Sequence, residues 1–100
     1  MARPTITIDG ETFELKKTLV QVFRKILKLE MERREIPLNE FVDRHCEIIA
    51  LAFGVTEEQV YDNLDVADVI PKYSEVSIYL SERLAGRIKK NEAEETAVQV

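Results

Sequence analysis

Cysteine, histidine and glycine are scarce in this sequence, and each shortage excludes a class of chemistry. Cys46 is the only cysteine, so no disulfide can form within the chain, which fits a reducing compartment. His45 is the only histidine, and the sequence has neither an HxxxH nor a CxxC pair to hold a metal. The three glycines are isolated, so no glycine-rich phosphate loop is present. We therefore expect a protein that is not an enzyme, with no catalytic, cofactor-binding or metal-binding residues.

Long hydrophobic runs are also missing. No segment approaches the roughly 18 apolar residues that a membrane span requires, and the first residues lead into a polar/apolar alternation without an apolar signal core. The remaining composition, 45% hydrophobic and 33% charged residues in a chain of 100, is that of a single globular domain with a modest core. We expect a cytoplasmic protein that does not interact with membranes.

Positive charge is in deficit, and it is unevenly placed. The formal net charge is −5. Residues 1–34 contain eight Lys and Arg against five Asp and Glu, whereas residues 35–100 contain six against fourteen. An acidic chain is a poor general nucleic-acid binder, because phosphate neutralisation dominates that affinity. The asymmetry leaves two interpretations open: head-to-tail self-association, or a solvated surface of uneven charge.

The first structural signal is a hairpin. Asp9-Gly10, flanked by alternating apolar and polar residues, is typical of a two-residue type I′ turn. In that register Ile6 pairs with Phe13, and Ile8 pairs with Glu11. The residues Ile6, Ile8, Phe13 and Leu15 then share one face, which must lie on helices or on another chain, because an isolated hairpin is marginally stable.

Helical patterns fill the rest of the chain. Thr18 and Gln21 form a candidate capping box for a first helix, whose apolar positions span an arc wide enough to predict cover on two sides. These positions are Leu19, Val22, Phe23, Ile26, Leu27, Leu29 and Met31. The neighbouring Arg24, Lys25 and Lys28 are typical of a solvated face.

The later helix boundaries are marked by Pro, Gly and capping residues. A second helix should begin at about Leu38 or Asn39 and end at Phe53, before Gly54. Its apolar stripe is Leu38, Phe41, Val42, Ile48, Ile49 and Ala52, with Phe53 at the edge. Thr56 to Gln59 form a second capping box for a short helix, and Asp65 should cap the next helical segment.

The last helix should begin near Pro71 and end around Lys90. Its stripe is Val69, Tyr73, Val76, Leu80, Leu84 and Ile88. The fold class is therefore mainly α: an N-terminal hairpin, at about residues 4–15, followed by a compact bundle of about four helices. We expect one domain over residues 1–90 and a flexible acidic tail over residues 91–100.

Three polar features have structural explanations that are favoured over functional ones. His45 lies near the centre of the second apolar stripe and is typical of a buried core histidine rather than a pH sensor. Cys46 points about 100° away from it on a helix, so the two form no dyad. Asp62, Asp65 and Asp68 resemble carboxylate ligands, but helix capping explains Asp65 more simply.

Apolar residues outside the main stripes indicate candidate interfaces. Ile78 projects nearly opposite the Leu80 stripe, Tyr79 lies to one side of it, and Leu51 lies off the stripe of the second helix. Such residues belong either to a helix covered on two sides or to a protein-binding surface. Our hypothesis is that Leu51, Ile78 and Tyr79 are protein-interface residues.

The order of these parts resembles one family, the tail assembly chaperones of long-tailed phages and prophages of Gram-positive bacteria. The resemblance covers about residues 5–90. It rests on the TITIDGETFEL hairpin, the helix with Leu-Val-Gln-Val-Phe-Arg-Lys-Ile-Leu, and above all the phrase GVTEEQVYDNLDVADVIP from Gly54 to Pro71. The family has no catalytic motif, and none of its binding residues can be transferred to a position here.

The resemblance implies a mostly helical chaperone that binds the tape measure protein, keeps it soluble, and helps to recruit the tail tube protein. It also implies a homo-oligomer that acts in the host cytoplasm and is absent from the mature virion. Two alternatives stay open. One is a small DNA-binding regulator, whose basic first helix would lie on phosphates, although the chain is acidic overall. The other is a structural head or tail subunit of the virion.

Overall fold

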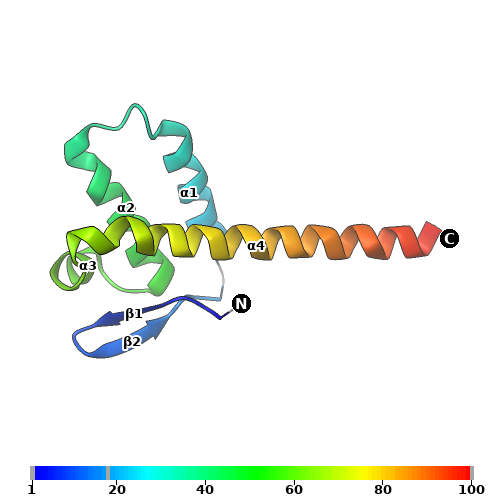
Figure 1. Cartoon of the computed structure of the whole chain (residues 1–100), viewed down its shortest axis with the longest axis horizontal. Coiled ribbons are helices and arrows are strands. Elements are labelled where there is room, and N and C mark those ends of the chain that lie inside the picture. Colours follow the sequence, from blue (N-terminus) through cyan, green and yellow to red (C-terminus); the bar gives the residue numbers. More distant parts are fainter. Residues whose placement is uncertain (1, 18, 100) are drawn as a thin grey trace.

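An antiparallel hairpin and four helices follow one another along the chain in the computed structural model (Figure 1). The strands are β1 (Thr5–Ile8) and β2 (Glu11–Glu14), and the helices are α1 (Val20–Glu32), α2 (Leu38–Phe53), α3 (Glu57–Asn63) and α4 (Val66–Gln99). The structure describes the backbone of residues 2–17 and 19–99 and the side chains of residues 2–17 and 19–86. The predicted fold class, a hairpin followed by a bundle of four helices, is confirmed.

The hairpin has the predicted turn and register. Asp9 and Gly10 both have positive φ, 50° and 80°, as a type I′ turn requires. Ile6 lies opposite Phe13 and Ile8 opposite Glu11. Ile6, Ile8 and Leu15 are buried and Phe13 is partly buried, so the predicted apolar face is the one that meets the helices.

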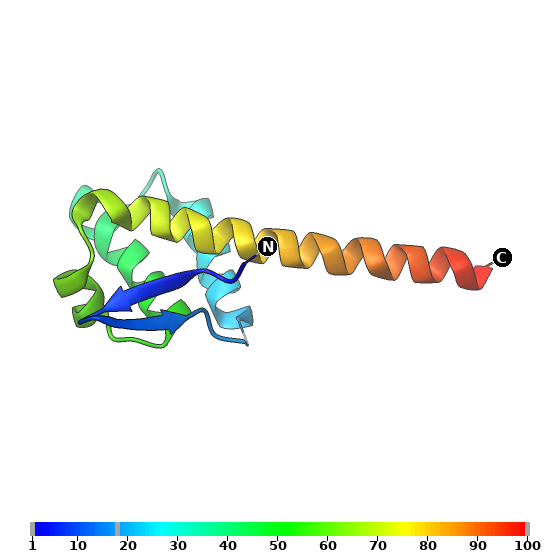
Figure 2. The same cartoon turned by 60° about the horizontal axis from the view of Figure 1, so that its bottom comes forward.

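Two polar contacts fix the hairpin to α3 and α4. The backbone N–H of Asp9 donates to Oδ1 of Asn63 at 2.9 Å. The ammonium of Lys72, on α4, donates to the carbonyl oxygen of Thr5 at 2.8 Å. Figure 2 shows the two strands running along the same end of the molecule as α3 and the first turns of α4. The hairpin is therefore part of the folded domain, and its buried residues belong to the same core as those of the helices.

The first helix differs from its predicted pattern. Thr18 lies outside the described residues, and the residue at the N-cap of α1 is Leu19, which makes no side-chain capping bond. The buried face of α1 consists of Val22, Ile26 and Leu29. The predicted cover on two sides is wrong among the described residues, because other apolar positions of α1 are exposed. These exposed positions are Val20, Leu27 and Met31.

The boundaries of α2 and α3 are set by the predicted local signals. Gly54 has the left-handed conformation, φ 72° and ψ 30°, and its N–H bonds to the carbonyl of Ala50, which ends α2. Thr56 and Gln59 form the predicted reciprocal capping box: the hydroxyl oxygen of Thr56 accepts from the Gln59 amide, and the Gln59 side chain accepts from the Thr56 amide. At the start of α2, Leu38 is exposed, so the predicted stripe begins later.

The last helix is longer than predicted at both ends. It begins at Val66, after Asp65, whose carboxylate accepts from the Ala67 amide at 2.8 Å as the predicted cap. Pro71 therefore lies inside α4 rather than at its start, in an exposed position, and it has no amide hydrogen to donate within the helix. The helix continues to Gln99, beyond the predicted end at Lys90. The flexibility predicted for residues 91–100 falls on side chains outside the described residues and stays a prediction.

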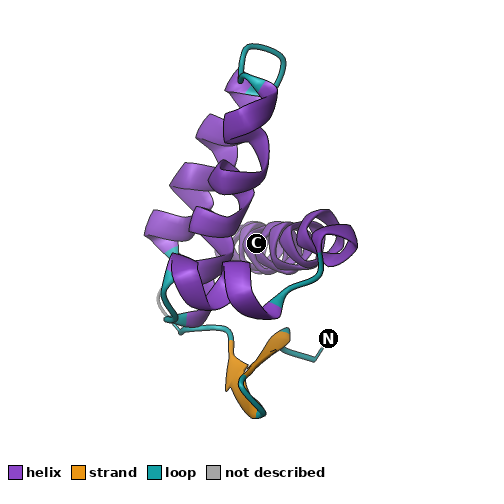
Figure 3. Ribbon diagram, turned by 90° about the vertical axis from the view of Figure 1, so that its left-hand side faces the viewer, coloured by secondary structure: helices purple, strands orange, loops and turns teal. Residues whose placement is uncertain are grey.

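The core lies around α2, which packs against α1, α3 and α4. Figure 3 looks along α4 and shows it to one side of the other helices, with the hairpin at their base. The molecule measures 56 × 35 × 19 Å, and its longest dimension follows α4, whose C-terminal part projects well beyond the other elements (Figure 1). In the part of the chain that the structure describes, no helix is both long enough and apolar enough to cross a membrane.

Candidate protein-binding surface

The three residues proposed as interface positions lie in different environments. Ile78 is 55% exposed and lines an open pocket with Glu30 and Arg33. Leu51, on α2, is exposed but is not among the residues of that pocket. Tyr79 is only 8% exposed, so its predicted surface position is corrected: its ring is buried. The structure therefore does not bring these three residues together on one surface.

Two arginine side chains lie near the hydroxyl group of Tyr79. Arg3, which precedes the hairpin, reaches the side of α4 on which Tyr79 lies. Arg83 donates to the Tyr79 hydroxyl at 3.4 Å, and its guanidinium lies 5.9 Å from the ring centroid. Hydrogen bonding from Arg3 and Arg83 lowers the pKa of that hydroxyl. Tyr79 thus orients Arg83 instead of offering an apolar surface.

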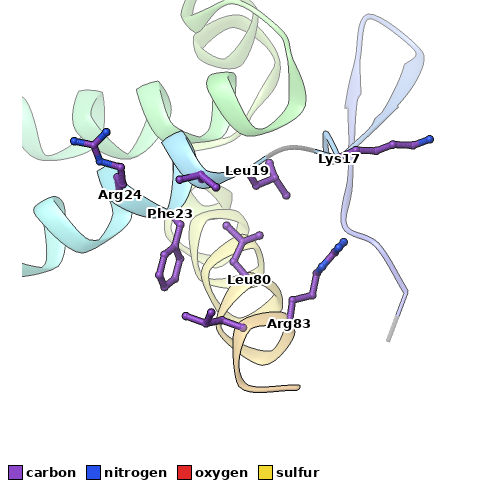
Figure 4. Close-up of a pocket in the computed structure, with 8 residues that line it drawn as sticks. Lys17, Leu19, Phe23, Arg24, Leu80 and Arg83 are labelled. Carbon is purple, nitrogen blue, oxygen red and sulfur yellow. The ribbon is translucent and has the colours of Figure 1, made fainter. Parts of the chain in front are cut away.

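A different apolar surface lies where the first turn of α1 meets the middle of α4 (Figure 4). We call it the α1–α4 corner. It is an open pocket of about 250 Å³ lined by Lys17, Leu19, Val20, Phe23, Arg24, Leu80, Arg83 and Leu84. Figure 4 shows Phe23 and Leu80 converging on the pocket from the two helices. The lining is apolar at the centre, which is the character of a site for an apolar side chain of a partner.

The rim of the corner carries positive charge. Lys17, Arg24 and Arg83 contribute three cationic side chains, and no carboxylate is among the described residues that line the pocket. Among the described residues, the ion pairs of the basic side chains are formed elsewhere, for example by Lys25 with Glu47 at 2.9 Å. The field in the corner therefore favours an apolar partner with acidic residues beside its anchor.

An exposed apolar stripe extends the corner along α1. Val20, Leu27 and Met31 are seven and four residues apart, a spacing that places them on one side of a helix, and they are 75%, 49% and 87% exposed. We call them the α1 outer stripe. Sequence analysis found these apolar positions, except Val20, but assigned them to a second covered face. The sequence signal for this surface was the apolar arc of α1, which is too wide for a helix with a single buried face.

The polar residues considered for chemistry are structural. His45 is fully buried between the rings of Phe41 and Tyr73, each with its centroid 4.5 Å away. Its Nδ1 lies 2.7 Å from the Phe41 carbonyl oxygen, which can only accept, so Nδ1 carries the proton. The predicted core histidine is confirmed. Burial, above all, lowers its pKa, and Nε2 has no hydrogen-bond partner among the described residues.

Cys46 and Asp65 also have ordinary structural roles. Burial raises the pKa of the Cys46 thiol, which favours the neutral, unreactive form. Asp65 is engaged as a helix cap. In the described ranges, no group of three or more His, Cys, Asp or Glu side chains is placed to hold a metal ion.

Comparisons of this chain with protein-family models, with curated proteins and with solved structures found no match. The class of protein is therefore defined by its own fold and surface: a small helical domain with an N-terminal hairpin and an exposed apolar surface bordered by cations.

Proposed function

We propose that this protein is a tail assembly chaperone of a long-tailed phage or prophage, which binds the tape measure protein and keeps it soluble until tail tube protein is recruited. The observation that carries the proposal is the exposed apolar surface formed by the α1–α4 corner and the α1 outer stripe. The resemblance of residues 5–90 to that family supplies the identity of the client.

The surface has the features that a helical client requires. An amphipathic helix lies in an apolar groove and anchors side chains at positions i, i+3 or i+4 and i+7. The α1 outer stripe supplies exposed anchors along one helix, and the corner supplies a recess at its end. Apolar groups exposed in this way favour an occupant that would otherwise aggregate, which is the expected behaviour of a long apolar tape measure protein.

Co-purification with the tape measure protein tests the proposal. The variant Leu27→Asp/Met31→Asp should reduce client binding by about tenfold or more, equivalent to about 1.4 kcal/mol, because it places charge on the anchor positions. The matched control is Leu38→Asp, since Leu38 is equally apolar and exposed but lies at the start of α2. The client should precipitate when expressed alone and remain soluble with the wild-type chain.

Two further measurements distinguish this proposal from the two alternatives, a structural subunit of the virion and a DNA-binding regulator. A chaperone should be undetectable by mass spectrometry in purified particles, whereas a virion subunit should be present in them. Salt-sensitive DNA binding in a gel shift, with no affinity for the tape measure protein, would support the DNA-binding regulator and reject our proposal. Equal client binding by the Leu27→Asp/Met31→Asp variant and the Leu38→Asp control would show that the α1 outer stripe is not the surface that binds the client.

A further inference from the structure

The Tyr79 hydroxyl holds two guanidinium groups side by side. Arg83, one turn further along α4, donates to it at 3.4 Å. Arg3, which precedes the hairpin, also donates to it, and hydrogen bonding from both arginines lowers the pKa of the hydroxyl. Because the Tyr79 ring is buried, its hydroxyl is a fixed point from which both side chains are positioned. We call Arg3 and Arg83 the arginine pair.

The arginine pair has no carboxylate partner among the described residues. The ion pairs in that part of the chain involve other basic side chains, which are Lys25, Arg33, Arg44 and Lys72. A neutral hydroxyl can accept hydrogen bonds from both guanidinium groups, but it cancels none of their charge. Two like charges beside one oxygen repel each other, and an anion placed between them removes that repulsion. The pair is therefore arranged to bind an anion, and the forked guanidinium group favours a carboxylate or a phosphate.

The arginine pair borders the apolar recess of the α1–α4 corner. Arg83 lines that pocket together with Phe23, Leu80 and Leu84. Figure 4 shows the Arg83 side chain extending from α4 toward the N-terminal segment, beside the converging Phe23 and Leu80. The pocket volume of about 250 Å³ is below the range of about 300–1,000 Å³ that is typical of sites for drug-sized ligands. The recess therefore fits one or two apolar side chains of a partner better than a whole small molecule.

A carboxylate beside an apolar anchor matches this arrangement better than a phosphate does. Nucleic acids bind through a row of phosphates, and the chain has a net charge of −5, so such a row would meet repulsion outside the corner. A membrane surface takes up protruding apolar side chains, whereas the apolar lining here is recessed between two helices. A helix of a partner protein presents an apolar and an acidic side chain on one side when they are one turn apart.

We propose that the arginine pair binds the carboxylate of an acidic residue that lies one helical turn from an apolar anchor in a partner helix, while the anchor fills the corner. Tyr79 is a positioning residue, which acts by holding Arg3 and Arg83 in place. The α1 outer stripe begins at Val20, which also lines the corner, so one partner helix can cover both surfaces. That this helix belongs to the tape measure protein rests on the proposed function, whereas its chemistry does not.

Fluorescence anisotropy with synthetic peptides tests the proposal without the client. The probe is a labelled amphipathic peptide of about 15 residues, near the shortest length at which a helix forms alone, with a leucine anchor and a glutamate one turn before and after it. The matched peptide has glutamines at those two positions. In about 50 mM salt the wild-type chain should bind the glutamate peptide about tenfold more tightly, because hydrogen bonds between ionised groups are stronger than neutral ones. This preference should decline in about 1 M salt.

Three variants of the chain separate the charge of the arginine pair from its positioning. Arg83→Gln should reduce the preference for glutamate to about twofold or less, because it removes one of the two charges. Tyr79→Phe retains the buried ring and both charges but removes the shared acceptor, so it should reduce the preference about threefold without changing the binding of the glutamine peptide. Arg34→Gln is the matched control, since Arg34 is exposed and lies outside the corner. Circular dichroism should show that all three variants are folded.

Four results would overturn the proposal. The first two are equal binding of both peptides by the wild type, and equal preferences in Arg83→Gln and Arg34→Gln. The third is an equal loss of both peptides in Tyr79→Phe, which would assign Tyr79 to the fold and not to the arginine pair. The fourth is tighter binding of oligothymidylate, or of vesicles that contain phosphatidylserine, than of the glutamate peptide. Because these assays contain no tape measure protein, failure of the co-purification leaves this proposal intact, and equal binding of the peptides leaves the proposed function intact.

Discussion

Stability below neutral pH should depend on His45. The imidazole is fully buried, with Nδ1 bonded to the Phe41 carbonyl and Nε2 unpartnered among the described residues, so a second proton would enter at a site with no acceptor. The pKa of His45 is lowered from the ordinary value of 6.5, and burial is the largest cause. The hydrogen bond to Phe41 and the charge of Glu30 raise the pKa, whereas the charges of Arg33 and Arg44 lower it further. Tyr73, the other titratable group packed on the ring, is neutral here because burial and its bond to Glu30 raise its pKa.

The sign and size of the effect are set by proton binding. Below pH 6.5 the unfolded chain takes up a proton on His45 that the folded chain does not, so the free energy of unfolding falls as pH falls. The loss approaches about 1.4 kcal/mol per pH unit between the unfolded pKa and the lowered folded pKa, and it stops below the folded pKa. Above about pH 7.5 this residue should contribute no pH dependence.

Urea unfolding followed by circular dichroism, at pH values from 5 to 8, measures this dependence. The matched variant is His45→Gln, which keeps a polar side chain without titrating in this range, so the carboxylates contribute equally to both proteins. The difference between the two curves isolates His45. Because the chain has one histidine, its ring protons also report the folded pKa directly by NMR. Parallel loss of stability in both proteins, or a folded pKa at or above 6.5, would refute the reasoning.

Four further substitutions test packing and caps by the same unfolding assay. Leu29→Ala should cost about 2–5 kcal/mol because Leu29 is fully buried, whereas Leu27→Ala should cost less than about 1 kcal/mol; equal losses would contradict the one-sided burial of α1. Gly54→Ala should cost about 1–2 kcal/mol, because a Cβ is strained at φ 72° even if the flexible Lys16 side chain moves away; an unchanged stability would contradict the left-handed cap. Thr56→Ala should cost about 0.5–2 kcal/mol through loss of the cap on α3, and a neutral result would show that the Gln59 bond is not needed.

Features coded by a few adjacent residues were predictable from the sequence. Asp9-Gly10 specifies a turn with two positive φ angles, and that turn alone determines the strand register. Gly54 and Thr56 act through their own backbone conformation and hydrogen bonds, so the end of α2 and the start of α3 were also predictable. Such signals need no knowledge of tertiary packing.

The start of α4 and the burial of Tyr79 were predicted less well. Pro71 marks a helix start on local grounds, yet the Asp65 cap begins α4 five residues before Pro71. Tyr79 lies off the main stripe of α4, yet its ring is only 8% exposed. Periodicity gives the direction of a side chain from its helix axis. It does not state which element lies in that direction.

The candidate binding surface shows this limit most clearly. The apolar arc of α1 is too wide for one contact, and a wide arc is explained equally well by a second covering element of the same chain or by a partner. Leu27 and Leu29 carry the same side chain two residues apart, yet one is half exposed and the other fully buried. The difference arises because residues two apart on a helix point in nearly opposite directions, so Leu29 faces the side on which α1 packs against α2 and α4, and Leu27 faces away from it. The remainder of the arc has no covering element among the described residues, and it is this exposed part of α1 on which the proposed client binding rests.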